Sequence, residues 1–394
     1  MRLWIVFFLQ GMTPGFWMPA LTNILRAHGL GSWVALVFIV PPLVTMISPL
    51  VGGALADQRV AADRLFAWTS VMGSVALVAA FGSLHAGWNP WWFVILLGCY
   101  SLFSGPGWGL LATIALTHLA DGERKFPLVR LGATLGWMAA GVITSYVLRA
   151  DTSPVVGYAS GVARFAAGVM AFSLPYTPPL GKAGSWKSRL GLDAFKLMKH
   201  RDHRVFFIVT GVYSIPLSAF YMYAPELLKV LGDQRSTATM TLAQITEIGA
   251  LLLVGSVLLR FRVKTVLLWS LGLSVLRFGM SAYAGASEMI GWHIAGIMLH
   301  GVCYTFYFVT AQIFLDRRVD PGMRGQAQGL LGLVTSGLGP LLGAIFCGWL
   351  RNYCVTADGR GWMEFWSILA GMIAVCFAVF ALCYQGLSRK ESES

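Results

Sequence analysis

A single carboxylate lies deep inside a long apolar stretch of this sequence. Glu247 stands ten residues into the apolar run 237–259, about 15 Å from its start at the rise of an α-helix. The other sixteen of the seventeen acidic residues fall in loops, tails or helix ends. Apolar surroundings favour the protonated carboxyl and a nearby cation favours the ionised one, so such a group can bind and release a proton. A structural glutamate paired with an internal arginine is the alternative.

Polar residues on two further helical faces supply hydrogen-bonding groups. Gln244 lies three residues before Glu247 and shares its face. Arg130, Thr134 and Trp137 follow an i, i+4, i+7 spacing, which places them on one face of a helix. That face offers a cation, a hydroxyl and an aromatic plane to one polar ligand.

His300, Tyr304 and Tyr307 repeat the same spacing in another apolar run. A buried histidine is either a satisfied core group or a ligand-binding group, and the two adjacent tyrosines keep both interpretations open. Arg164 and Arg277 are single cations in apolar stretches. Because a charge at the bilayer centre costs at least ~2.5–3.5 kcal/mol, we expect both arginines to pack or pair between helices.

Catalytic and metal-binding motifs are missing from the sequence. It contains no HExxH, no GxSxG and no Walker P-loop, and the run from Gly105 to Gly109 (Gly-Pro-Gly-Trp-Gly) follows no predicted strand. The six cysteines show no CxxC spacing and lie mostly inside apolar runs, which is typical of small core residues. We therefore expect no catalytic residues, no metal site, no cofactor and no enzymatic activity.

The composition specifies the elements that must position these residues. Of 394 residues, 57% are hydrophobic and 12% charged, and the mean hydropathy is +0.68. Soluble domains carry about 25% charged residues, so this chain has too little polar surface for soluble domains. Near-continuous apolar runs exclude a β-barrel and predict an all-α polytopic membrane protein.

Twelve runs are long enough to cross a bilayer, which needs roughly 20 apolar residues per helix. Their approximate limits are 3–25, 32–56, 65–87, 90–118, 126–148, 154–176, 205–230, 237–259, 264–286, 289–315, 323–350 and 362–386. The first run has no small-residue cleavage site, so we expect a retained helix rather than a signal peptide.

The charges predict the orientation and the division of the chain. With the N-terminus inside, twenty Lys and Arg side chains fall on the cytoplasmic side and six on the other, so both termini are expected in the cytoplasm. The net charge of +12 then reflects cytoplasmic loops rather than nucleic-acid binding. The basic connection between the sixth and seventh runs predicts four parts: an N-terminal six-helix half (1–176), a cytoplasmic linker (177–204), a C-terminal six-helix half (205–386) and a tail (387–394). Two parallel halves with a site at their interface are a common transporter plan.

Several motifs resemble those of a known transporter family. The stretch from Gly53 to Arg59 (Gly-Ala-Leu-Ala-Asp-Gln-Arg) resembles the GxLaD(R/K) signature of the major facilitator superfamily, although the later Gly-Arg-Lys portion is degraded. Nearly the whole chain resembles the nucleoside:proton symporter family within it. The stretches that carry the similarity are Phe8–Gln10, Gly15–Pro19, His118–Leu119, Glu123–Arg124, Arg130–Trp137, Gln244–Glu247, His300–Tyr304, Gln312 and Arg324–Leu330.

The resemblance implies a major facilitator fold that takes up nucleosides with protons. It implies that Arg130, Thr134 and Trp137 face the nucleoside, that Gln244 hydrogen-bonds it, and that Glu247 binds it or couples it to protonation. His300 and Tyr304 occupy positions that are usually aromatic in the family, and Tyr304 is expected to stack on a base.

Three departures concern polar groups of the family pattern. Leu111-Ala112-Thr113 replaces Thr-Asn-Ser after Pro106, Ser218 and Tyr221 stand near a Gln/Asn pair, and Thr305 replaces an acid. They leave Glu247 as the one obvious proton carrier.

Two alternatives to proton-coupled nucleoside uptake stay open. One is a major facilitator transporter of another small polar solute, such as a sugar, metabolite or drug, which includes the case of an exporter. The other is a membrane enzyme or receptor, for which the sequence offers no reactive cluster and no extra soluble domain. As partners we expect a small-molecule substrate, protons and the lipid bilayer of the cytoplasmic membrane, with no nucleic acid, for a chain that acts as a monomer and uses the proton gradient as its energy source.

Overall fold

The computed structural model describes residues 1–181, 192–233, 239–356 and 358–386, and this part of the chain is helical with no strand. The residues 182–191 of the predicted linker and the predicted tail 387–394 lie outside the described residues. The chain folds as two compact units, one of Met1–Ala194 with Val319–Leu338 and a second of Phe195–Arg318 with Gly339–Ser394. The division into six-helix halves at the linker stays a prediction.

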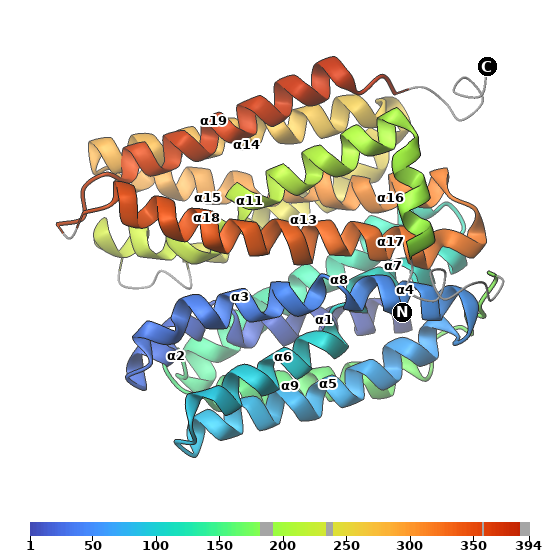
Figure 1. The fold of residues 1–394 in the computed structure, drawn as a ribbon, viewed down its shortest axis with the longest axis horizontal. Helices are drawn as coiled ribbons and strands as arrows, with labels where there is room; N and C mark the ends of the chain where they lie inside the picture. The colour runs from blue at the N-terminus through green and yellow to red at the C-terminus, as the bar shows by residue number, and fades with distance from the viewer. Residues whose placement is uncertain (182–191, 234–238, 357, 387–394) are drawn as a thin grey trace. The chain divides into compact units, whose positions relative to one another are not determined.

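Among its described residues, the first unit contains ten α-helices, whose arrangement is drawn in Figure 1. They are α1 (Arg2–Trp17), α2 (Leu21–Ala27), α3 (Val34–Thr45), α4 (Ser48–Gln58), α5 (Ala62–His85), α6 (Pro90–Ser104), α7 (Gly107–His118), α8 (Gly122–Val142), α9 (Val155–Ala171) and α17 (Arg324–Gly332). Short 3-10 or π turns flank them at Gly31–Trp33, Ile143–Leu148, Pro321–Met323 and Leu333–Leu338. Helix α1 packs against α8 and α9, and α17 packs against α4.

The second unit contains seven α-helices among its described residues. They are α11 (Arg201–Val230), α13 (Leu242–Arg260), α14 (Val263–Ser287), α15 (Ile290–Tyr304), α16 (Thr310–Arg318), α18 (Gly339–Cys354) and α19 (Trp362–Cys383). A π-helical turn η4 (Thr305–Val309) joins α15 to α16, and a 3-10 helix η3 (Leu192–Lys199) precedes α11. Helix α15 packs against α13 and α14, and α11 packs against α18 and α19.

The predicted apolar runs are found as helices. Ten helical segments of the described chain are long and apolar enough to cross a membrane, and the sixth run forms the shorter apolar helix α9. The first run forms two helices, α1 and α2, instead of one. Helix α8 begins at Gly122, so Arg130 lies on its third turn.

Glycines allow α8 to press directly onto α1. A side chain at Gly136 would place its Cβ 1.9 Å from the Phe8 carbonyl oxygen, and one at Gly11 would reach the same distance from the Ala133 oxygen. Membrane helices have no hydrophobic drive to associate in lipid, so close backbone approach through small residues supplies much of their packing energy. The glycine face of α8 is thereby fixed against α1, which leaves another face for its polar residues.

The signature around Asp57 is helical. Its second half forms the last turn of α4, and Asp57 is 5% exposed. Its carboxylate accepts hydrogen bonds from the backbone N–H groups of Gly325 (3.0 Å) and Gln326 (2.9 Å), at the first turn of α17. The first backbone N–H groups of a helix have no partner within that helix, and the Asp57 carboxylate accepts hydrogen bonds from two of them. Its negative charge also complements the positive end of the α17 dipole.

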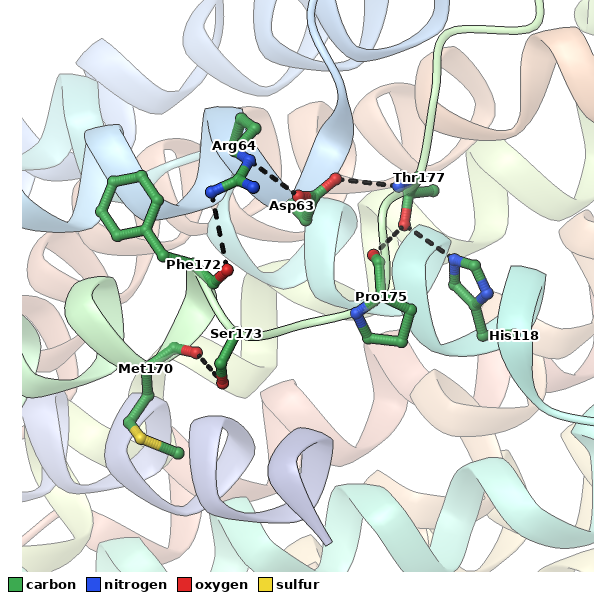
Figure 2. A network of polar contacts seen from close by, with 8 residues as sticks. All are labelled: Asp63, Arg64, His118, Met170, Phe172, Ser173, Pro175 and Thr177. Carbon is green, nitrogen blue, oxygen red and sulfur yellow. Dashed lines mark hydrogen bonds and ion pairs between the residues drawn. The ribbon is translucent and has the colours of Figure 1, made fainter.

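A polar network ties the segment after α9 to α5 and α7 (Figure 2). The buried Asp63 accepts the backbone N–H of Thr177 at 2.9 Å, and Arg64 pairs with Asp63 at 3.4 Å. The Thr177 hydroxyl donates to the Pro175 carbonyl at 3.0 Å, so its oxygen accepts from Nε2 of His118 at 2.9 Å. The start of the predicted linker is therefore anchored to the first unit.

Candidate functional site

Helix α8 presents the predicted polar stripe of the first unit. Arg130 is 6% exposed, Thr134 is buried and Trp137 is half-buried. The spacing of the three side chains puts them on one face, about 145° around the helix from Gly132 and Gly136, the glycines that contact α1. Sequence and structure therefore agree that one face of α8 gathers a guanidinium, a hydroxyl and an indole.

The guanidinium of Arg130 has an aromatic neighbour that the sequence did not single out as a site residue. Its central carbon lies 5.0 Å from the ring centroid of Trp108, which comes from the second residue of α7. A cation at this distance from an indole is within the range of a cation–π interaction.

In the second unit, the backbones of α13 and α15 cross at Gly301. A Cβ at this glycine would lie 2.1 Å from the Ala243 oxygen and 2.3 Å from the Glu247 nitrogen. This crossing holds the Gln244–Glu247 turn of α13 against the His300–Tyr304 turn of α15. Two of the predicted pairs, far apart in sequence, are thus neighbours.

The polar residues at this crossing form a cluster with α11. Glu247 and Tyr304 are both half-buried and lie within electrostatic range of the Tyr221 hydroxyl. Gln244 is 7% exposed, and its amide oxygen has no hydrogen-bond partner within the described part of the chain. The cluster combines one carboxylate, two tyrosine hydroxyls and one amide, and Arg277 also lies within electrostatic range of the Tyr221 hydroxyl. Such a set of groups suits recognition of a polar ligand together with a proton.

His300 is fixed in orientation by two residues of α11. Its ring stacks on Phe220 with centroids 3.9 Å apart and an interplanar angle of 12°. Its Nε2 lies 3.3 Å from the hydroxyl of Tyr221. The ring is 1% exposed, and Nδ1 has no partner among the residues described. A rigidly held imidazole with one unused nitrogen is suited to bind a ligand atom.

Tyr307 does not share the face of His300 and Tyr304, so the predicted stripe of three is wrong at its third member. The π-helical turn η4 adds a residue to the turn and shifts the register. Tyr304 contacts Phe308, four residues further along (ring centroids 4.9 Å apart), whereas the Tyr307 hydroxyl lies 3.0 Å from the Thr210 hydroxyl on α11. Tyr307 belongs to the core between α11 and α15.

Tyr221 belongs to the cluster, although the sequence did not single it out as a site residue. Tyr213, on the same helix, is a core residue, since it is fully buried and its hydroxyl lies 2.7 Å from that of Ser274. Tyr221 instead joins the cluster at His300. Its position near the polar pair of the family pattern was the available signal.

The two buried arginines bridge helices, as expected. Arg164 of α9 donates to the amide oxygen of Gln10 on α1 and lies over Phe66 of α5. Arg277 of α14 lies 5.1 Å from the ring centroid of Phe220 on α11. Thr305, which stands in place of the family's acid, is fully buried.

The described residues contain no group of three or more His, Cys, Asp or Glu side chains that could hold a metal ion. The free cysteines of the described chain form no disulfide.

Comparison with known proteins assigns the family. The protein-family model described as "Nucleoside H+ symporter" matches residues 1–389. This chain belongs to that family. The symporter is 31% identical over 402 residues to the putative nucleoside transporter YegT of Escherichia coli (strain K12), covering 98% of this chain and 93% of the relative. It is 26% identical over 400 residues to the xanthosine permease of the same organism, covering 96% and 94% of the two chains.

Solved structures confirm the fold of the symporter. A crystal structure of the nucleoside transporter NupG matches with a TM-score of 0.73 at 23% identity, over 98% of each chain. The proton:xylose symporter XylE matches with a TM-score of 0.74 at 13% identity, over 100% of this chain and 98% of the other. The expected all-α major facilitator fold is confirmed, and the family consists of transporters, which confirms that the chain is not an enzyme.

Proposed function

We propose that this symporter carries nucleosides into the cell together with protons, by alternating access across the cytoplasmic membrane. The observation that supports this most is Glu247, a carboxylate at membrane depth that shares a cluster with Tyr221, His300 and Tyr304 in a chain of the nucleoside H+ symporter family. The polar stripe of α8 and this cluster both contribute to nucleoside recognition.

Glu247 supplies the coupling in this proposal. The proton neutralises the carboxylate when the site is open to the outer side. The change to the inward-facing state then costs less free energy, because a neutral group in apolar surroundings costs less than a charged one. Release of the proton inside restores the charge and disfavours return of the substrate. No cofactor is required, and the proton gradient is the energy source.

The remaining assignments concern topology. Both termini and the connection after α9 face the cytoplasm in this proposal, because the basic side chains concentrate there. The protein acts as a monomer in this proposal, because one chain carries both of the six-helix halves that the sequence predicts.

The test is uptake by purified protein in liposomes. Labelled uridine, adenosine, inosine and xanthosine are each offered with and without an inwardly directed proton gradient. We expect accumulation above equilibrium only with the gradient. In Glu247→Gln the gradient should no longer drive accumulation, while Glu364→Gln, which alters an exposed carboxylate at the start of α19, should behave as the unchanged protein.

Retained coupling in Glu247→Gln would contradict the role of this carboxylate. A thermal-shift panel of nucleosides and sugars identifies the substrate class independently, because a ligand at 100 times its Kd stabilises the folded protein by ~2.7 kcal/mol. Stabilisation by sugars alone would contradict the nucleoside assignment and favour another polar solute.

A further inference from the structure

The run Gly105-Pro106-Gly107-Trp108-Gly109 has no role in the function proposed above. It lies where α6 ends and α7 begins. Its small residues are in close contact with neighbouring helices of the first unit: a Cβ at Gly107 would lie 3.2 Å from the Gln10 amide nitrogen, and one at Gly109 would lie 3.4 Å from Cβ of Gln328. Trp108 is the one bulky side chain of the run.

This packing directs Trp108 toward α8. Its half-buried indole lies 5.0 Å from the guanidinium carbon of Arg130, which is itself 6% exposed. A cation–π interaction strengthens when the cation is removed from water. The guanidinium is planar and stacks on aromatic rings, and it presents its N–H donors in a fixed fork.

We propose that Trp108 is a positioning residue that fixes the plane of the Arg130 guanidinium, so that two of its N–H groups meet two adjacent acceptor atoms of the substrate. The inference rests on the proposed function, because it takes Arg130 as a substrate-binding residue. The substrate recognised in this way carries two neighbouring hydrogen-bond acceptor atoms that lie in one plane. A nucleoside offers it in two places: the O2′ and O3′ oxygens of the ribose, or the O6 and N7 atoms of an oxopurine base.

The two sources are separated by three ligands. Inosine carries both pairs of acceptor atoms. 2′-Deoxyinosine carries only the O6 and N7 pair of the base, and uridine carries only the O2′ and O3′ pair of the ribose. Trp108→Leu should weaken binding of inosine by about fivefold to thirtyfold, which corresponds to the ~1–2 kcal/mol of a partly desolvated cation–π interaction. If Trp108→Leu weakens binding of 2′-deoxyinosine equally and leaves binding of uridine unchanged, Arg130 contacts the base. If binding of uridine is weakened and binding of 2′-deoxyinosine is unchanged, Arg130 contacts the ribose.

A double-mutant cycle tests whether Trp108 acts through Arg130. Affinities for the three ligands are measured by calorimetry for the unchanged protein, Trp108→Leu, Arg130→Lys and the double variant. We expect the double variant to bind no more weakly than Arg130→Lys, since lysine lacks the planar fork that Trp108 orients. Trp108→Phe keeps an aromatic face and should recover most of the affinity, whereas Trp92→Leu, an exposed residue of α6, should bind as the unchanged protein.

The negative results distinguish the positioning role of Trp108 from the proposed function. Additive losses in the cycle, or unchanged affinity of Trp108→Leu for all three ligands, overturn the positioning role while the proposed function stands. If Trp108→Leu does not fold, Trp108→Met, which keeps an apolar side chain without a ring, decides in its place: binding weaker than that of the unchanged protein and non-additive with Arg130→Lys supports the role, and additive loss or no loss overturns it. Failure of the unchanged protein to bind any of the three nucleosides overturns the proposed function and this inference with it.

Discussion

The crossing of α13 and α15 at Gly301 provides the strictest test of the second-unit cluster. Gly301→Ala adds one methyl group whose carbon would lie 2.1 Å from the Ala243 oxygen and 2.3 Å from the Glu247 nitrogen. Both are backbone atoms of a helix, so neither can rotate away as a side chain would. The two helices must separate, and the separation acts directly on the turn that carries Glu247.

The magnitude follows from two opposing effects. Overpacking a close contact costs about 1–3 kcal/mol, and clashes with two rigid backbone atoms belong at the upper end of that range. Replacing glycine by alanine in a helix returns roughly 1 kcal/mol through the lower entropy of the unfolded chain. We therefore expect a net loss of about 2 kcal/mol in stability, together with a strong fall in substrate affinity because the cluster loses its geometry.

The matched control is Gly249→Ala on α13, the helix that carries Glu247. Gly249 lies two residues from Glu247, yet a Cβ there would have no neighbour within 4 Å. This variant should be as stable as the unchanged protein or slightly more so, with full uptake. Thermal unfolding in detergent and nucleoside uptake in liposomes measure both effects. Equal behaviour of the two alanine variants would refute the assignment of Gly301 as the point that sets the α13–α15 distance.

Three further predictions concern single contacts. Asp57→Ala should lower stability by about 1–2 kcal/mol, because two backbone donors of α17 lose their cap, and Asp57→Asn should lose less in the same unfolding assay because it keeps an acceptor. Tyr213→Phe should cost about 1–3 kcal/mol by leaving the buried Ser274 hydroxyl without its 2.7 Å partner; a double variant with Ser274→Ala that costs the full sum of both single losses would contradict this account. The Thr356 hydroxyl lowers the pKa of Asp358 in the exposed loop before α19, so this contact stabilises the loop above the ordinary pKa of aspartate and is lost as the pH falls through the lowered value. Titration of the carboxyl carbon by NMR should show the pKa rising in Thr356→Val, and an unchanged pKa would exclude the hydroxyl as the cause.

Residues within one helix could be placed from the sequence, because their relation depends on local geometry alone. The stripe of Arg130, Thr134 and Trp137 required only the helical period, and the structure keeps it on one face of α8. The same reasoning failed at Tyr307, where a π-helical turn changes the period. The sequence around α15 contains no feature that predicts the π-helical turn.

The sequence by itself determined the membrane-protein class and most of the apolar helices, since these depend on composition and on runs of apolar residues that each segment carries alone. The start of a helix was less well predicted: α13 begins at Leu242, so Glu247 stands five residues after its start rather than ten residues into the run. It also carried enough motif similarity to indicate the family. Only the tertiary structure decided which residues of different helices meet: Tyr221 with His300, Trp108 with Arg130 and Asp57 with the first turn of α17. Such contacts depend on how helices cross, and the crossings are set by small residues such as Gly301 whose partners lie far away in the chain.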